Sequence, residues 1–312
     1  MAKKQQYRIR NWSNYNKSLV NRGSLTLWFD EESIKNWHQV NPNGHRGRPQ
    51  VYADIAISCM LTIKMVFKLP LRATQGLVSS LISLLNLPIH SADYSTVARR
   101  QKKLEPILFK GKVSEPLHVV FDSTGLKVFG EGEWKVRQHG WSKRRTWRKL
   151  HLGVDEKTGA IIAASLTTND VGDSEVLPDL VAQIEEVINQ ASADGAYDSF
   201  DNYALLEKLG AKVTIPPRET AVIRQHGNCK APTLQRDKNL RSIRKIGKVT
   251  WKNQSGYHRR SLAETAMFRF KTLLGRHLMA KNFDSQATEA FIKCNIMNKM
   301  TSLGMPDSYA VV

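Results

Sequence analysis

Tyr257-His-Arg-Arg260-Ser-Leu-Ala-Glu264-Thr-Ala-Met-Phe-Arg-Phe-Lys271 combines helix-forming apolar positions with a fixed set of polar groups. At about 100° per residue, Tyr257, Arg260, Glu264 and Lys271 fall within about 60° of one another on an ideal α-helix. On another side lie Leu262, Phe270, Leu273 and Leu274, which can be buried. The stretch therefore predicts a helix over about residues 261–274. Its polar face would present a carboxylate framed by two cations and a phenol.

Glu264 has two interpretations. Ser261-Leu-Ala-Glu264 has the spacing of a capping box, in which Ser261 would be the N-cap and Glu264 the third helical residue. In the other interpretation Glu264 is a metal ligand beside phosphate-binding groups. The local pattern leaves both open, although a capping box gives no reason for the positions of Tyr257, Arg260 and Lys271.

Two aspartates are placed to join such a glutamate. Asp122 directly follows the apolar run 117–121, which predicts a strand, and Asp194 follows a second strand candidate. Strand ends expose functional side chains in α/β sheets. Carboxylates gathered at one sheet edge need cations to stay ionised, and oxygen ligands favour Mg²⁺ or Mn²⁺. Each aspartate taken alone is also an ordinary turn or cap residue.

These segments resemble a known family. The arrangement Y-x2-R-x3-E-x6-K, formed by Tyr257, Arg260, Glu264 and Lys271, is similar to the motif of bacterial insertion-sequence DDE transposases, in particular the families numbered four and five. Residues 119–125 resemble the first-aspartate block of that family, and residues 193–199 resemble the second. The resemblance spans roughly residues 5–305.

The resemblance implies a ribonuclease-H-like α/β fold, with a mixed sheet flanked by helices, the first aspartate on the central strand and the glutamate on a late helix. It implies that Asp122, Asp194 and Glu264 are both the catalytic residues and the ligands of two Mg²⁺ (or Mn²⁺) ions, with Asp194 preferred over Asp198. Such an enzyme cleaves DNA at the terminal inverted repeats and transfers the 3′-hydroxyl into target DNA, a reaction in which two ions can serve both steps. Synapsis of two ends implies a homodimer.

The resemblance also assigns roles to the cations and the phenol of the motif. Arg260 and Lys271 would hold backbone phosphates or a flanking nucleotide, and Tyr257 would contact a phosphate. Arginine suits bidentate phosphate recognition better than lysine.

The chain divides into an N-terminal helical region, 1–110, and a catalytic domain, 111–305. Helical patterns over 50–66, 71–86 and 92–104, interrupted by Pro70 and Pro88, suit a helix-turn-helix module that binds DNA. Its third helix would bring Ser95, Thr96, Arg99 and Arg100 to the major groove, but a plain helical bundle fits the pattern equally well.

Later segments predict strands over 150–154, 161–166 and 211–215, an amphipathic helix over 175–188, a basic irregular insertion at about 218–256, and a last helix over about 285–300.

Charge points to a polyanionic partner. The 312 residues include 47 Lys+Arg and 28 Asp+Glu, a formal net charge of +19, and basic side chains bind nucleic acid by displacing counterions. Two basic stretches could line the DNA path, although solvated charged loops would look the same. One contains Arg144, Arg145 and Arg148 among tryptophans, and the other spans 236–252.

No apolar run approaches the roughly 20 residues of a membrane span, and no signal peptide begins the chain, which predicts a cytoplasmic, nucleoid-associated protein without a membrane partner.

Two other functions share parts of this pattern. A site-specific nuclease of the same fold would cut DNA without joining it. A non-catalytic DNA-binding regulator would keep the basic surface and lose the carboxylates, and all three carboxylates are present here.

Overall fold

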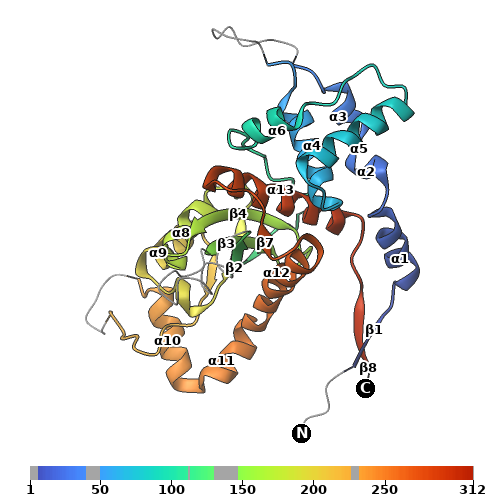
Figure 1. Ribbon diagram of the computed structural model, residues 1–312. Coiled ribbons are helices and arrows are strands. Elements are labelled where there is room, and N and C mark those ends of the chain that lie inside the picture. Colours follow the sequence, from blue (N-terminus) through green and yellow to red (C-terminus); the bar gives the residue numbers. More distant parts are fainter. Residues whose placement is uncertain (1–5, 40–49, 112, 130–146, 226–231, 312) are drawn as a thin grey trace, which may run out of the picture. The chain divides into compact units, whose positions relative to one another are not determined.

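The computed structural model describes residues 6–39, 50–111, 113–129, 147–225 and 232–311 (Figure 1). It divides into two compact units, one formed by Met1–Ile107 with Asn295–Val312 and the other by Leu108–Cys294. The C-terminal residues therefore group with the N-terminal region. Arg144 and Arg145, which the sequence analysis assigned to DNA, lie outside the described residues. No helix in the described ranges is long and apolar enough to cross a membrane.

The N-terminal unit contains the three expected helices and more. The helices lie at Asp54–Val66 (α4), Leu71–Leu84 (α5) and Tyr94–Gln101 (α6). Three short helices and a two-stranded antiparallel sheet were not predicted; they are Trp12–Asn21 (α1), Leu25–Trp28 (α2), Glu31–Lys35 (α3), Gln6–Ile9 (β1) and Ser308–Val311 (β8).

The ends of these helices follow from local chemistry. Pro70 precedes the first residue of α5, where its missing amide hydrogen costs nothing. Asp93 precedes α6, and its carboxylate accepts a hydrogen bond of 2.9 Å from the amide of Ser95. The apolar positions then pack together, with Trp37, Ile57 and Val97 fully buried.

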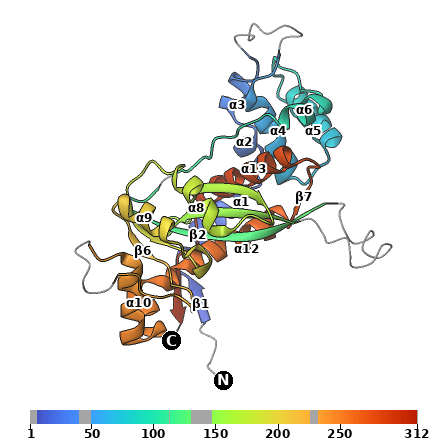
Figure 2. The same cartoon turned by 90° about the vertical axis from the view of Figure 1, so that its left-hand side faces the viewer.

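The second unit, Leu108–Cys294, is built on a six-stranded mixed sheet (Figure 2). Its strands are Leu117–Val128 (β2), Trp147–Asp155 (β3), Ile161–Thr168 (β4), Ile188–Ser192 (β5), Lys212–Thr214 (β6) and His277–Leu278 (β7). The order is β4-β3-β2-β5-β6, and β7 pairs with the far end of β2. Strand β2 is antiparallel to β3 and parallel to β5. The α/β fold is therefore as predicted, a ribonuclease-H-like mixed sheet with the first aspartate on a central strand.

Helices cover both faces of this sheet. Leu117, Val119 and Phe121 point to one face, where they are buried with residues of Asp173–Val181 (α8) and Phe200–Lys208 (α9). Because side chains alternate along a strand, Val120 and Asp122 point to the other face. There the helix Ser261–Leu274 (α12) contacts β2 and β3.

Several predicted elements have different limits. The helix predicted over 175–188 ends at Val181, and residues from Ile188 onward form β5. The segment 218–256, expected to be irregular, contains the helices Gln235–Ile246 (α10) and Lys248–Ser255 (α11), which are anchored by the buried side chains of Leu240 and Trp251. The last helix, Phe283–Ser302 (α13), was predicted within two residues at each end.

The strand that carries Asp122 is longer than predicted. The sequence analysis ended it at residue 121, but β2 continues to Val128. Antiparallel pairing with β3 carries it on, since Asp122 lies opposite Leu152 and Lys127 lies opposite Trp147. Asp122 is therefore a mid-strand residue rather than a residue at a strand end.

Candidate active site

Arg260 joins two of the three candidate carboxylates. It ends the 3₁₀ turn Tyr257–Arg260 (η2) that leads into α12. One guanidinium nitrogen lies 3.1 Å from Oδ2 of Asp122, and another bonds Oε1 of Glu264. The four-residue spacing places Glu264 on the same side of the helix start as Arg260. Residues 138 positions apart in the chain therefore meet at one side chain.

Asp122 is held within the sheet. Its side chain is only 12% exposed, and its Oδ1 accepts a hydrogen bond of 2.9 Å from the amide of Ser123. Burial raises the pKa of Asp122 to about 6; the Ser123 bond and the charge of Arg260 oppose this rise, and the charges of Asp194 and Glu264 add to it. Asp194 and Glu264 are therefore both close enough to Asp122 to act on it electrostatically.

Asp194 precedes a short 3₁₀ turn, Gly195–Tyr197 (η1), two residues after the end of β5. Its Oδ1 accepts a hydrogen bond of 2.9 Å from the amide of Ala196, and the side chain is half-buried. Asp198, the alternative from sequence, is engaged elsewhere. Its fully buried carboxylate bonds two guanidinium nitrogens of Arg236 at 2.7 and 2.9 Å, together with the amide of Arg218.

Glu264 lies in the first turn of α12 with its side chain 54% exposed. The capping-box interpretation is wrong. Ser261 has helical dihedrals (φ −56°, ψ −17°) and is the first residue of the helix, whereas an N-cap has extended dihedrals. The residue before the helix is Arg260, which makes no side-chain cap bond to the helix backbone. The carboxylate of Glu264 is thus free of a capping role and pairs with Arg260 instead.

The other motif residues are arranged less simply than an ideal helix predicts. Tyr257 lies in η2, and its buried ring is 5.8 Å from the guanidinium of Arg260 and 4.9 Å from the ammonium of Lys252. Lys271 lies on α12, about 10 Å along the axis from Glu264. Burial, followed by repulsion from Arg276, lowers the pKa of Lys271. Tyr257, Arg260 and Glu264 thus form one group, which Lys271 does not join.

The carboxylates suit a divalent cation chemically but are not at coordination distance. Within the described ranges, no three carboxylate, imidazole or thiolate side chains are close enough to hold one ion. The donor set consists only of oxygen, as Mg²⁺ and Mn²⁺ prefer. The positive charge between Asp122 and Glu264 is the guanidinium of Arg260. The residues therefore fit a divalent cation, provided that Arg260 moves from between them.

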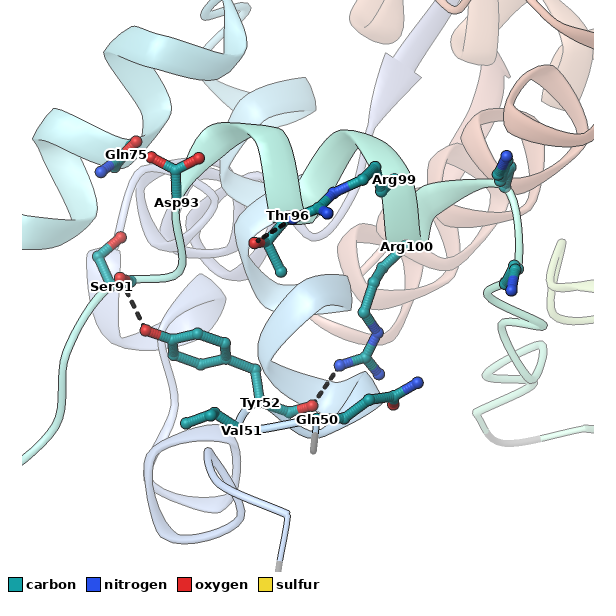
Figure 3. Close-up of a pocket in the computed structure, with 11 residues that line it drawn as sticks. Gln50, Val51, Tyr52, Gln75, Ser91, Asp93, Thr96, Arg99 and Arg100 are labelled. Carbon is teal, nitrogen blue, oxygen red and sulfur yellow. Dashed lines mark hydrogen bonds between the residues drawn. The ribbon is translucent and has the colours of Figure 1, made fainter. Parts of the chain in front are cut away.

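Three of the four candidate DNA contacts of the N-terminal unit, Thr96, Arg99 and Arg100, line a cavity of about 670 Å³ beside α6, and Ser95 does not (Figure 3). Arg100 bonds the carbonyl of Tyr52 and the carboxylate of Asp54, so it holds the entrance to α4 against α6. Arg99 bonds only its own helix among the described residues, at the carbonyl of Ser95 and the hydroxyl of Thr96.

Arg148 lies near the start of β3 in the second unit. It bonds Oε1 of Gln286 at 2.9 Å and packs over the ring of Phe283. Arg236, counted in the second basic stretch from sequence, is buried against Asp198 and belongs to the interior.

Comparison with known proteins identifies the family. A family model described as a transposase DDE domain matches residues 114–299, and a second model of the same description matches residues 20–131. A cryo-EM structure of a piggyBac transposase synaptic complex with hairpin DNA is 14% identical, with a TM-score of 0.43, over 96% of this chain and 77% of that one. Because the first model alone covers more than half of the 312 residues, the chain belongs to the DDE transposase family, whose members catalyse DNA transposition with the help of divalent metal ions.

Proposed function

We propose that Asp122, Asp194 and Glu264 are the catalytic residues of this transposase and hold two Mg²⁺ or Mn²⁺ ions. The observation that supports this most strongly is the bridge of Arg260 between Asp122 and Glu264, together with the charge of Asp194 acting on both Asp122 and Arg260. These contacts support a site in which carboxylates from a central strand, the loop after β5 and a late helix come together. A bound pair of such ions activates an attacking hydroxyl and stabilises the leaving oxygen.

The protein groups have separate tasks in the proposed reaction. Asp122 supplies a rigid anchor because it lies in the middle of a paired strand. Glu264 is the most exposed of the three and can adjust its side chain. Arg260, released from the carboxylates, offers a planar pair of donors for a backbone phosphate. The ring of Tyr257 limits where that guanidinium can move.

The substrate we propose is double-stranded DNA, first the terminal inverted repeats of an insertion sequence of family four or five and then target DNA. The same site would cleave the ends and join the 3′-hydroxyl to the target, in a homodimer that holds two ends. Residues 1–110 would form the DNA-binding region and residues 111–305 the catalytic domain. In the binding region Arg99, exposed beside Lys102 and Lys103 along the cavity, is the strongest candidate for a phosphate contact.

The test uses duplex DNA carrying the inverted repeats that flank the gene. The variants Asp122→Ala, Asp194→Ala and Glu264→Ala should bind these ends like wild type and fail to nick them in Mg²⁺ or Mn²⁺. Nicking by any of the three removes that residue from the catalytic set. A second assay with pre-cleaved ends separates a transposase from a nuclease, because only a transposase joins them to a target.

A further inference from the structure

Asp173 organises a partly buried polar cluster beside β2. It is the first residue of α8, and its side chain is 16% exposed. Oδ2 accepts a hydrogen bond of 2.8 Å from the hydroxyl of Ser123 on β2. Oδ1 accepts one of 3.1 Å from the ammonium of Lys149 on β3. One carboxylate therefore ties together two strands and a helix.

This cluster is linked to Asp122 by a single residue. Ser123 follows Asp122 in β2, and its amide donates to Oδ1 of Asp122 at 2.9 Å. Its side chain points to the opposite face of the sheet, where its hydroxyl meets Asp173. The backbone amide of Ser123 thus bonds the candidate catalytic carboxylate, and its hydroxyl bonds Asp173 on the opposite face of the sheet.

Two buried polar atoms near Asp173 have no hydrogen-bond partner among the described residues. The Nδ1 of His151 is 4.0 Å from Oδ1 of Asp173, too long for a hydrogen bond, and within the described part of the chain neither it nor the hydroxyl of Tyr197 makes one. Both side chains are fully buried. Burial and then the charges of Asp173, Asp122 and Asp194 raise the pKa of Tyr197.

A carboxylate that already accepts two hydrogen bonds can accept about two more. Asp173 therefore has acceptor capacity left beside two unpartnered polar atoms, the Nδ1 of His151 and the hydroxyl of Tyr197. A buried polar group without a partner costs stability, so its presence beside the site points to a role.

A second serine–aspartate pair in the same unit shows what a purely structural version looks like. The hydroxyl of Ser114 donates to Asp155 at 2.6 Å. That carboxylate also accepts from the amides of Ser114 and Lys157 and from the hydroxyl of Thr158. It faces no orphaned donor among the described residues and has no link to Asp122. The two pairs are alike in chemistry and differ in what they adjoin.

We propose that Asp173 is a positioning residue for Asp122, acting through Ser123. Asp173 fixes the position of Ser123 by accepting a hydrogen bond from its hydroxyl. The amide of Ser123 then holds the Asp122 carboxylate in the orientation in which it can bind a cation. This inference rests on the proposed function, since Asp122 is the group being oriented.

The test compares Ser123→Ala with the matched control Ser114→Ala, alongside Ser123→Thr and Asp173→Asn. Each variant is the full chain. Two quantities are measured: the rise in melting temperature on adding Mn²⁺ without DNA, and the Mn²⁺ concentration for half-maximal nicking of end DNA. Removing an outer partner of a metal ligand costs about 10–100-fold in metal affinity or activity. Ser123→Ala and Asp173→Asn should therefore need at least about tenfold more Mn²⁺ and show a smaller Mn²⁺-induced rise.

Ser114→Ala should melt at a lower temperature than wild type and keep the wild-type Mn²⁺ dependence. Ser123→Thr, which retains the hydroxyl, should restore that dependence. Wild-type Mn²⁺ dependence in both Ser123→Ala and Asp173→Asn would overturn the positioning role. The Asp122→Ala variant distinguishes the two proposals. If it still nicks DNA, the proposed active site is wrong. If it is inactive and Ser123→Ala has wild-type Mn²⁺ dependence, only the positioning role of Asp173 is wrong.

Discussion

The two aspartates of the second block, Asp194 and Asp198, should respond in opposite ways to substitution by alanine. Asp198 is fully buried and pairs with Arg236, whose side chain is 9% exposed. Asp194 is half-buried and accepts one amide bond, from Ala196. Asp198→Ala should therefore impair folding, whereas Asp194→Ala should leave the fold intact and abolish cleavage.

The size of each effect follows from these bonds. Removing Asp198 leaves the guanidinium of Arg236 buried without its partner, which costs about 3–5 kcal/mol. For a unit of this size each kcal/mol shifts the melting temperature by roughly 2–4 °C, so a fall of roughly 6–20 °C is expected. Losing the single amide bond of Asp194 costs about 0.5–2 kcal/mol, as for a helix cap. The two melting temperatures should be clearly separated.

Thermal melting by circular dichroism measures the first effect, and Mg²⁺-dependent nicking of end DNA, performed below both melting temperatures, measures the second. The double variant Asp198→Asn with Arg236→Gln removes both charges and should recover part of the missing stability. If Asp198→Ala melts like wild type and is inactive, while Asp194→Ala is active, the assignment of the two aspartates is reversed.

Three further outcomes are expected. Tyr197→Phe removes a hydroxyl without a partner among the described residues and should leave the free energy of unfolding unchanged or raise it; Tyr203→Phe removes one that donates to the Ile215 carbonyl and should lower it by about 1 kcal/mol, both measured by urea denaturation. Because burial raises the pKa of Asp122 to about 6, the folded state binds more protons than the unfolded state between about pH 4 and 6, and stability falls as pH rises through this window. Asp122→Asn should therefore be more stable than wild type above pH 6, by on the order of 3 kcal/mol at most, with no difference below pH 4; equal stability at pH 8 would contradict this. Replacing the exposed Lys238 and Lys245 of α10 by glutamine should flatten the salt dependence of DNA binding by about 0.9 for each phosphate that the variant no longer neutralises, and an unchanged slope would remove α10 from the DNA path.

Local patterns predicted the elements whose ends are chemically marked. Helix α5 begins directly after Pro70, and the bounds of α12 were predicted from the apolar spacing of residues 261–274. The strand β2 was cut short in the prediction because the apolar run 117–121 ends at Asp122. Only the pairing with β3, more than 20 residues away, carries the strand through this stretch. Cross-strand partners stabilise such residues more than their own propensities do.

Other elements depend on partners that no local pattern contains. The segment containing α10 was expected to be irregular, yet it forms a helix in which Leu240 is buried, Arg236 is buried against Asp198 and Asn239 bonds the carbonyl of Val213. The pairing of β1 with β8 joins residues some 300 positions apart, such as Tyr7 and Ala310. A sequence shows these residues as ordinary polar or terminal positions, and only tertiary structure gives them partners.

The candidate site depends both on local residue spacing and on tertiary contacts. The three-residue step from Tyr257 places a ring beside Arg260, and the four-residue step to Glu264 places a carboxylate within its reach; both are local consequences of one helical segment. The bond from Arg260 to Asp122 needs the sheet, because α12 must lie across β2 for the two to meet. Arg260 bonds Glu264, four residues away, and Asp122, 138 residues away, and so links the helix α12 to the strand β2. Disrupting the helix start should for that reason weaken the bond of Arg260 to Asp122 as well as its bond to Glu264.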